Sequence, residues 1–315
     1  MPLTFTQESD FRQERDFGQK ISATFEFLGA HWRPLGRVLL YLVLPIALLQ
    51  GVIGALLQSE LLSSVMRYPG AVYPGRLGMY SSMYGQMLSS PYYYINLIVS
   101  FAFNSVLILT IYGYLLHCLY PPVPGAPVLP SQVWGVVRSR FVGTFFSLIG
   151  LAIVLGLSSF LFVIPGIYLA VALSLFFIVR MVENTSFGTT FSRCLSLTKG
   201  KWWSTAGLIF IIILILYLLI AGFTIFWSLL LSTTRGLLPA MGDNFLFLRV
   251  LVAAVTPLAT LLVYLPMLVA LAFQYFNLVE RKEGVGMHHL VDQLGQAAPA
   301  GPANDAYRPV EEGEY

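Results

Sequence analysis

Long apolar runs separated by short polar connections occupy most of this chain. Six of the runs carry few or no charged residues, and each is long enough for a helix to cross a hydrocarbon core of about 30 Å, which takes roughly 20 residues. We place these spans at about residues 38–57, 95–116, 141–163, 164–182, 205–231 and 249–276. The pattern predicts an all-α polytopic membrane protein with six transmembrane helices arranged as three hairpins.

One sixteen-residue phrase occurs twice, each time directly before an apolar run. FGQKISATFEFLGAHW begins at residue 17 and FGTTFSRCLSLTKGKW begins at residue 187. Four aligned positions are identical: Phe17 and Phe187, Gly18 and Gly188, Ser22 and Ser192, and Trp32 and Trp202. An internal duplication explains the repeat, and so does convergence on the residues that any helix entering a membrane prefers.

Apolar residues in each copy recur every three or four positions, which is the spacing of one face of a helix. Phe17, Phe25 and Trp32 share this stripe in the first copy, whereas Lys20 and Glu26 lie off it. The pattern predicts an amphipathic helix that lies in the membrane interface with its apolar face in lipid. A weaker third copy, residues 129–141, is expected to form another interfacial helix before the third span.

Composition indicates a membrane protein, and the distribution of charge predicts which side of the membrane the connections face. Hydrophobic residues make up 57% of the chain and charged residues 10%, and the mean hydropathy of +0.75 excludes a soluble domain. Fourteen of the 18 Lys and Arg residues fall in the terminal segments and in the connections after the second and fourth spans. The positive-inside bias therefore predicts that both termini lie in the cytoplasm.

These patterns divide the chain into three parts. We expect residues 1–37 to form a cytoplasmic arm with an interfacial helix, and residues 38–277 to form the membrane domain. Residues 278–315 are expected to form a cytoplasmic tail. Its small, Pro-rich and acidic end predicts disorder after about residue 295.

Several short motifs resemble those of a known membrane family. They are Pro165-Gly166, Glu183 just after a span, Ser192, the phrase LTKG that ends at Gly200, and Trp202. These residues resemble the membrane domain that is attached to some glycerophosphodiester phosphodiesterases and that also occurs in stand-alone six-span bacterial proteins. The opening DFGQKISATFEFLGAHWRPLG and the closing FNLVERKEG, which contains Asn277 and Glu280, are similar to stand-alone members of the Bacteroidetes type.

The resemblance implies a fold and a location but no reaction. It covers the chain from about residue 16 to residue 284 and implies a multi-pass protein of the bacterial cytoplasmic (inner) membrane. In the fused family members, hydrolysis belongs to a soluble barrel with a metal-binding set of carboxylates and histidines, which this sequence lacks. No catalytic residue is carried over, and we predict that the protein is not an enzyme.

The motif residues also have structural explanations. Pro165 suits the first turn of a helix and Gly166 permits close approach, so residues 163–166 are predicted to form the outer turn between the third and fourth spans. Glu183 is expected to form an ion pair at the membrane rim with Arg193 or Lys199.

Two further positions are expected to interrupt helices. Gly200 is predicted to end the second interfacial helix, so that Trp202 begins the next span. Pro45 is expected to kink the first span, because proline lacks the N–H that an interior helical position donates.

Side chains that carry chemistry are scarce inside the predicted spans. Asn104 is the candidate polar site within the membrane, although asparagine there more often bonds to a neighbouring helix or to its own backbone. No nucleophile motif, glycine-rich phosphate loop or HExxH motif occurs. We therefore expect no catalytic, cofactor-binding or metal-binding site, and no nucleic acid partner.

Two segments leave alternatives open. Met79, Met83 and Met87 recur every four residues, which suits either a soft metal ion such as Cu(I) or an interfacial helix that dips into the headgroups. The closing segment around Asn277 and Glu280 suits a solvated helix end. It also suits a cytoplasmic platform, formed with the two interfacial helices, for a protein partner.

Two classes of function remain. The first is a membrane module that organises protein partners or interacts with the lipid bilayer, favoured by the amphipathic helices and the low charge of the spans. The second is a transporter, flippase-like or channel protein for a lipid or small molecule. The repeats, the proline-kinked spans and Asn104 favour this second class.

Overall fold

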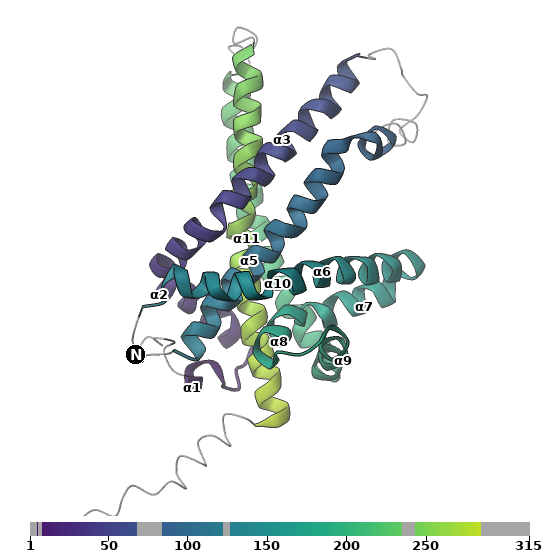
Figure 1. The fold of residues 1–315 in the computed structure, drawn as a ribbon. Coiled ribbons are helices and arrows are strands. Elements are labelled where there is room, and N and C mark those ends of the chain that lie inside the picture. Colours follow the sequence, from purple (N-terminus) through teal and green to yellow (C-terminus); the bar gives the residue numbers. More distant parts are fainter. Residues whose placement is uncertain (1–4, 6–7, 68–83, 122–126, 235–242, 285–315) are drawn as a thin grey trace, which may run out of the picture.

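The computed structural model describes residues 5, 8–67, 84–121, 127–234 and 243–284 (Figure 1). Every regular element among these residues is helical. The main helices are α1 (Glu8–Phe11), α2 (Phe17–Leu42), α3 (Leu44–Arg67), α5 (Pro91–Leu119), α6 (Pro130–Leu161), α7 (Val163–Leu173), α8 (Phe176–Glu183), α9 (Phe187–Thr198), α10 (Trp202–Thr234) and α11 (Asp243–Glu283).

Five helical segments are long and apolar enough to cross a membrane. They are Leu44–Leu61, Pro91–Leu119, Pro130–Leu161, Val163–Glu183 and Leu261–Glu283. A sixth is obtained if α9 and the start of α10 form one span that is bent by 95°. The prediction of an all-α polytopic membrane protein is confirmed.

α11 is the central element of the bundle. Its 41 residues extend for about 60 Å at 1.5 Å per residue. It packs most extensively on α3 and also contacts α2, α5, α8, α9 and α10. Figure 1 shows α3, α5 and α11 extending upward, whereas the hairpin of α6 and α7 extends to the side.

The first interfacial helix continues past the predicted boundary between residues 37 and 38. α2 extends to Leu42 with Pro34 inside it, and the helical path is interrupted only at Val43. Pro45 explains the interruption, because it lacks the N–H that would bond to the Tyr41 carbonyl and its ring crowds that carbonyl. The effect of Pro45 therefore lies at the start of the first span rather than within it.

Two other helix boundaries differ from the prediction. The expected third interfacial helix is not separate, because α6 is continuous and buries Val133 and Val137 on the face that also carries its later contacts. The fourth span, Val163–Glu183, is one span as predicted, but its helix is interrupted at residues 174–175, between α7 and α8. Ser174 Oγ donates to the Val171 carbonyl at 2.7 Å there, a local bond of the kind that competes with helical hydrogen bonding.

A tight turn joins α6 to α7, one residue before the predicted segment 163–166. Phe162 is the single residue between the two helices, with an extended backbone (φ −150°, ψ 117°). Pro165 lies in the first turn of α7, where N–H groups have no intrahelical partner. Gly166 lies so close to α6 that an added Cβ would be 2.8 Å from the Ser159 Cα.

The segment before α2 is packed into the protein. Phe5 and Phe11 are fully buried and join Phe27 of α2 and two α11 residues, Phe273 and Phe276, in an aromatic cluster. Phe5 lies 5.6 Å from both Phe27 and Phe273 between ring centroids. Each buried phenylalanine contributes roughly 1.5–3 kcal/mol relative to an exposed one. The cluster therefore fixes the N-terminal arm against α11.

The apolar stripe of the first copy faces outward. Phe17 is 39% exposed, Phe25 43% and Trp32 65%. These side chains form an exposed aromatic row on the outer side of α2. The matching stripe of the second copy is less open, because Phe187 and Leu195 are half-buried.

Some predicted features lie outside the described residues. They are Met79 and Met83 of the methionine pattern and the tail after residue 295. Met87 lies in a short described helical segment, residues 84–89.

The close approach at Gly166 can be tested by one added methyl group. Gly166→Ala should lower the free energy of unfolding by about 1–3 kcal/mol, because the Cβ overlaps α6 backbone that cannot move freely. Thermal unfolding of the purified protein in detergent measures this change. Gly156→Ala is the matched control on α6, since its Cβ would meet nothing within 4 Å. Equal unfolding temperatures for both variants would contradict the close approach.

Candidate functional site

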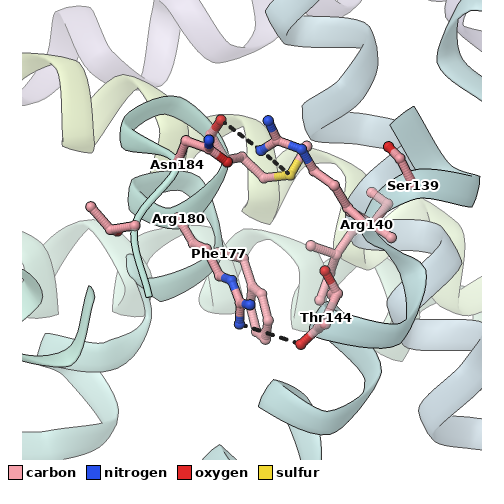
Figure 2. Close-up of a pocket in the computed structure, with 11 residues that line it drawn as sticks. Ser139, Arg140, Thr144, Phe177, Arg180 and Asn184 are labelled. Carbon is pink, nitrogen blue, oxygen red and sulfur yellow. Dashed lines mark hydrogen bonds between the residues drawn. The ribbon is translucent and has the colours of Figure 1, made fainter. Parts of the chain in front are cut away.

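A polar cavity of about 190 Å³ lies between α5, α6 and α8 (Figure 2). Arg140 from α6 and Arg180 from α8 both line it. The other lining residues carry no charge, and the polar ones among them are Ser139, Thr144, Asn184 and Thr185. We refer to this space as the arginine cavity.

Each arginine bonds to the helix that carries the other. Arg140 Nη1 donates to the Met181 carbonyl at 3.1 Å. Arg180 Nη1 donates to the Gly143 carbonyl at 3.3 Å and to Ser147 Oγ. In the part of the chain that the structure describes, no carboxylate forms an ion pair with either guanidinium. Two positive charges therefore line the cavity with only neutral dipoles to offset them, an arrangement that attracts an anion.

The turn at Phe162 brings these two arginines together. Arg140 precedes the turn by 22 residues and Arg180 follows it by 18, so both lie about 30 Å from it along their helices. Gly143 leaves room for the Arg180 side chain, since an added Cβ would lie 3.1 Å from Arg180 Nη2. The length of the hairpin arms and one missing side chain thus shape the cavity.

An open, mainly apolar groove of about 440 Å³ adjoins the cavity. Its lining residues are Gly143, Phe146, Ser147, Gly150, Arg180 and Phe187. Arg180 and Gly143 belong to both spaces. Gly150 lets the Phe187 ring lie against α6 in the wall of the groove, because an added Cβ there would be 3.3 Å from that ring.

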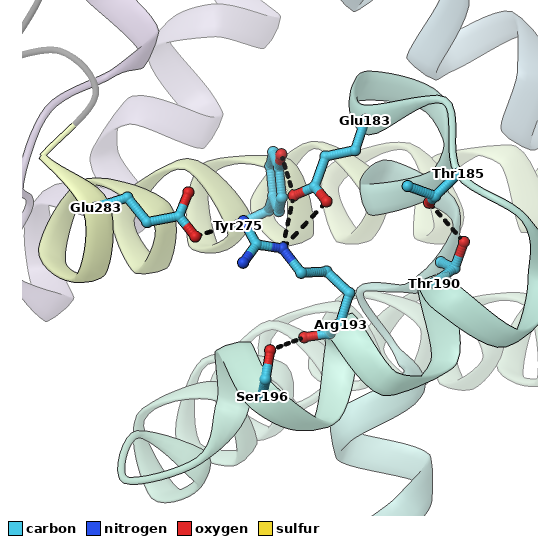
Figure 3. Close-up of polar contacts among 7 residues, drawn as sticks. All are labelled: Glu183, Thr185, Thr190, Arg193, Ser196, Tyr275 and Glu283. Carbon is cyan, nitrogen blue, oxygen red and sulfur yellow. Dashed lines mark hydrogen bonds and ion pairs between the residues drawn. The ribbon is translucent and has the colours of Figure 1, made fainter.

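Glu183 closes the end of α8 with the ion pair to Arg193 that the sequence suggested (Figure 3). Arg193 Nε donates to both Glu183 oxygens, at 3.0 and 3.1 Å. Tyr275 of α11 donates its hydroxyl to Glu183 Oε1 at 3.1 Å. Arg193 Nη2 also lies 2.6 Å from Glu283 Oε1. The four side chains fix α8 and α9 against the end of α11.

The turn between α8 and α9 presents polar groups to the arginine cavity. Asn184 has a left-handed backbone (φ 51°, ψ 42°), which asparagine tolerates better than most residues. The Thr185 hydroxyl bonds to that of Thr190 at 2.8 Å, and Ser186 caps the N-terminus of α9. Glu183 does not line the arginine cavity. It fixes the start of the turn, and the next two residues, Asn184 and Thr185, do line the cavity.

The end of α9 is the helix stop that the sequence predicted at Gly200. Gly200 has φ +81°, a conformation that glycine adopts without strain, and α10 starts at Trp202. Lys282 of α11 donates to the carbonyls of Ser196 and Lys199, which a helix end leaves without intrahelical partners. Trp202 Nε1 donates to the Tyr168 carbonyl at 3.1 Å and so ties α10 to α7.

Lys20, which the pattern placed on the polar side of α2, is buried inside the protein. It is 2% exposed, and its Nζ donates to Gln274 Oε1 at 2.7 Å and to Ser204 Oγ at 3.1 Å. Gln274 in turn donates to Thr205 Oγ1 at 2.9 Å. Burial lowers the pKa of Lys20 from 10.5 to about 8, and the positive charge of Arg281 adds to this effect.

Asn277 and Glu280 do not belong to a solvated helix end. They are 2% and 9% exposed, and the N-terminal arm contacts Asn277. Asn277 Oδ1 accepts the backbone N–H of Arg15 at 2.8 Å and is 3.4 Å from Arg281 Nε. The sequence separation of 262 residues between Arg15 and Asn277 explains why a local pattern did not reveal this contact.

The remaining predicted residues do not converge on the cavity. Gly18, Ser22 and Ser192 are exposed on the outer sides of α2 and α9. Asn104 Nδ2 donates to the Ser100 carbonyl of its own helix at 2.8 Å, which is the ordinary role considered for it.

In the sequence, Arg140 and Arg180 are only two of the 14 Lys and Arg residues that predict the orientation. The signal that identifies them is their position in a hairpin with a one-residue turn. Each lies on its own arm, near the open end of the hairpin. Such a hairpin places both charges in the wall of one cavity.

The chain matches no protein-family model, no curated protein and no solved structure. The resemblance to the glycerophosphodiester phosphodiesterase membrane domain therefore stays a prediction.

The contacts of Arg193 can be tested by its removal. Arg193→Ala should lower the free energy of unfolding by about 1 kcal/mol, since the network is partly exposed, and should speed amide exchange in residues 184–190. Hydrogen exchange followed by mass spectrometry measures the second effect. Lys199→Ala, which removes an exposed neighbouring cation, is the control. Unchanged exchange in Arg193→Ala would show that the ion pairs do not hold the turn.

The pKa of Lys20 predicts a specific pH dependence. Between pH 8 and 10.5 the unfolded chain keeps the Lys20 proton while the folded protein has lost it, so stability rises with pH. Lys20→Met has no titrating group at this position, so its free energy of unfolding should not show this rise. Between pH 8 and 10.5 the wild type should therefore gain roughly 2–4 kcal/mol of stability relative to Lys20→Met. Unfolding in detergent at several pH values measures it, with the exposed Lys199→Met as control. A pH-independent difference would mean that Lys20 titrates normally.

Proposed function

We propose that the protein is a membrane module that interacts with lipid and has no catalytic role. The observation that supports this proposal is the apolar surface that the described helices leave open. It includes the outer stripe of α2 and the tip of the hairpin of α6 and α7. At that tip five consecutive apolar residues, from Phe160 to Ile164, are between 66% and 88% exposed.

Such a surface requires lipid. Each Å² of apolar surface removed from water contributes about 25 cal/mol, so leaving five large side chains in water would be costly. The hairpin tip is therefore a lipid-contacting element, and the exposed aromatic residues of α2 extend the contact to the interface.

The membrane and the orientation are part of the same proposal. The excess of Lys and Arg in the terminal segments supports cytoplasmic termini, and the family resemblance supports the bacterial cytoplasmic membrane. A protein partner would meet the exposed outer face of α9, where Ser192 and Lys199 point outward. The lipid bilayer is the principal partner.

A transporter or flippase-like protein is the second candidate, and Lys20 favours it. A buried cation that bonds to a side chain of a membrane span, as Lys20 does to Gln274, is costly and is often retained for transport. Flux of a lipid or small molecule in liposomes that is lost in Lys20→Met, with the fold intact, would replace the first proposal by this one.

The lipid contact of the doubled phrase can be tested with paired charges. Phe25→Glu combined with Leu195→Glu should release α2 and α9 from lipid, because a carboxylate on the apolar stripe opposes its insertion. Hydrogen exchange in nanodiscs should then increase at least several-fold in both segments. Ser22→Glu with Ser192→Glu adds the same charge on the flank of each helix and is the matched control. Unchanged protection in the first variant would contradict the interfacial role.

A further inference from the structure

The arginine cavity and the apolar groove can hold one molecule between them. They share Arg180 and Gly143, so a ligand group in the cavity continues into the groove past these two residues. The cavity of about 190 Å³ is smaller than a typical small-molecule site of about 300–1,000 Å³. It suits a compact charged group, and the larger groove suits an apolar chain.

The chemistry of the cavity is that of a phosphate site. Guanidinium groups bind phosphate with two parallel hydrogen bonds, and both arginines have donors beyond those already used for Met181, Gly143 and Ser147. Ser139, Thr144, Asn184 and Thr185 add uncharged polar groups to the same wall. No lining residue is acidic, so nothing in the wall repels an anion.

The position of the cavity favours a lipid as the source of that phosphate. Arg140 directly precedes the apolar part of α6, and Arg180 lies in the last turn of the span Val163–Glu183. These are the ends of the hydrophobic segments, where lipid headgroups lie. The adjoining groove is lined by Phe146, Gly150 and Phe187, which suit an acyl chain and not a soluble anion.

We propose that Arg140 and Arg180 bind the phosphate of an anionic phospholipid whose acyl chain lies in the apolar groove. This inference rests on the proposed function and deepens it, because it names the lipid class and the site. The two arginines recognise net negative charge, and Gly143 and Gly150 leave room for Arg180 and Phe187 to line the site.

Native mass spectrometry of the full-length protein tests the proposal. The protein is equilibrated in mixed micelles with equal amounts of anionic phosphatidylglycerol and zwitterionic phosphatidylcholine, and the retained lipid is identified. The wild type should retain phosphatidylglycerol preferentially. Arg140→Gln combined with Arg180→Gln should reduce this preference at least about tenfold, because it removes the two cations that favour a net negative headgroup over one whose phosphate is neutralised by choline.

The control is Arg138→Gln, because Arg138 lies on the same helix, is exposed and does not line the cavity. It should keep the wild-type preference. Gly150→Leu is a second test that leaves both arginines in place and displaces the Phe187 ring, which lines the groove. It should lower retention of phosphatidylglycerol several-fold, and it keeps the proposal testable if the double arginine variant does not fold.

The possible failures differ from one another. Wild-type protein that retains no lipid would overturn the proposed function itself. Lipid that is retained without headgroup preference, or with the same preference in the double variant, would overturn only the arginine site. Competition by inorganic phosphate at millimolar concentration, with Gly150→Leu behaving as the wild type, would show that the site takes a soluble phosphate and would overturn the lipid assignment.

Discussion

The last three turns of α11 contact nearly every element at the charged end of the molecule. Phe273 packs against the N-terminal arm, Gln274 bonds to Lys20 of α2, and Tyr275 bonds to Glu183 at the end of α8. Lys282 and Glu283 then hold α9. Successive residues of a helix point in different directions, so one short segment can bind partners all around it. Both copies of the doubled phrase depend on this segment for their position.

The two copies bury corresponding faces. Lys20 and Thr190, Thr24 and Cys194, and Phe27 and Leu197 are equivalent pairs at the offset of 170, and all six residues are buried. The helices that carry the copies end differently. α2 continues for ten residues beyond Trp32, whereas α9 ends before Gly200 and the chain bends by 95° into α10. The two helices share a packing face, but the chain continues differently after each of them. This difference explains why the sequence similarity ends at Trp32 and Trp202.

Features that depend on local sequence were the predictable ones. Apolar run length identified an all-α polytopic membrane protein, Gly200 identified the end of α9, and Pro165-Gly166 identified the tight turn to within one residue. Lys20 was misplaced because helical periodicity shows which residues share a face but not which face meets a distant partner. Gln274 is 254 residues away. Arg140 and Arg180 were missed for a related reason, since only the folded hairpin makes two rim charges into one site.

The turn at Phe162 has a consequence for how the hairpin enters the bilayer. All the charged residues of α6, α7 and α8 lie near the open end, from Arg138 to Arg140 on one arm and from Arg180 to Glu183 on the other. The closed end, at the turn around Phe162, carries only apolar and weakly polar side chains. The two arms can therefore insert together, tip first, without moving any charge across the membrane, and the arginine cavity is assembled when the arms stop at the headgroups.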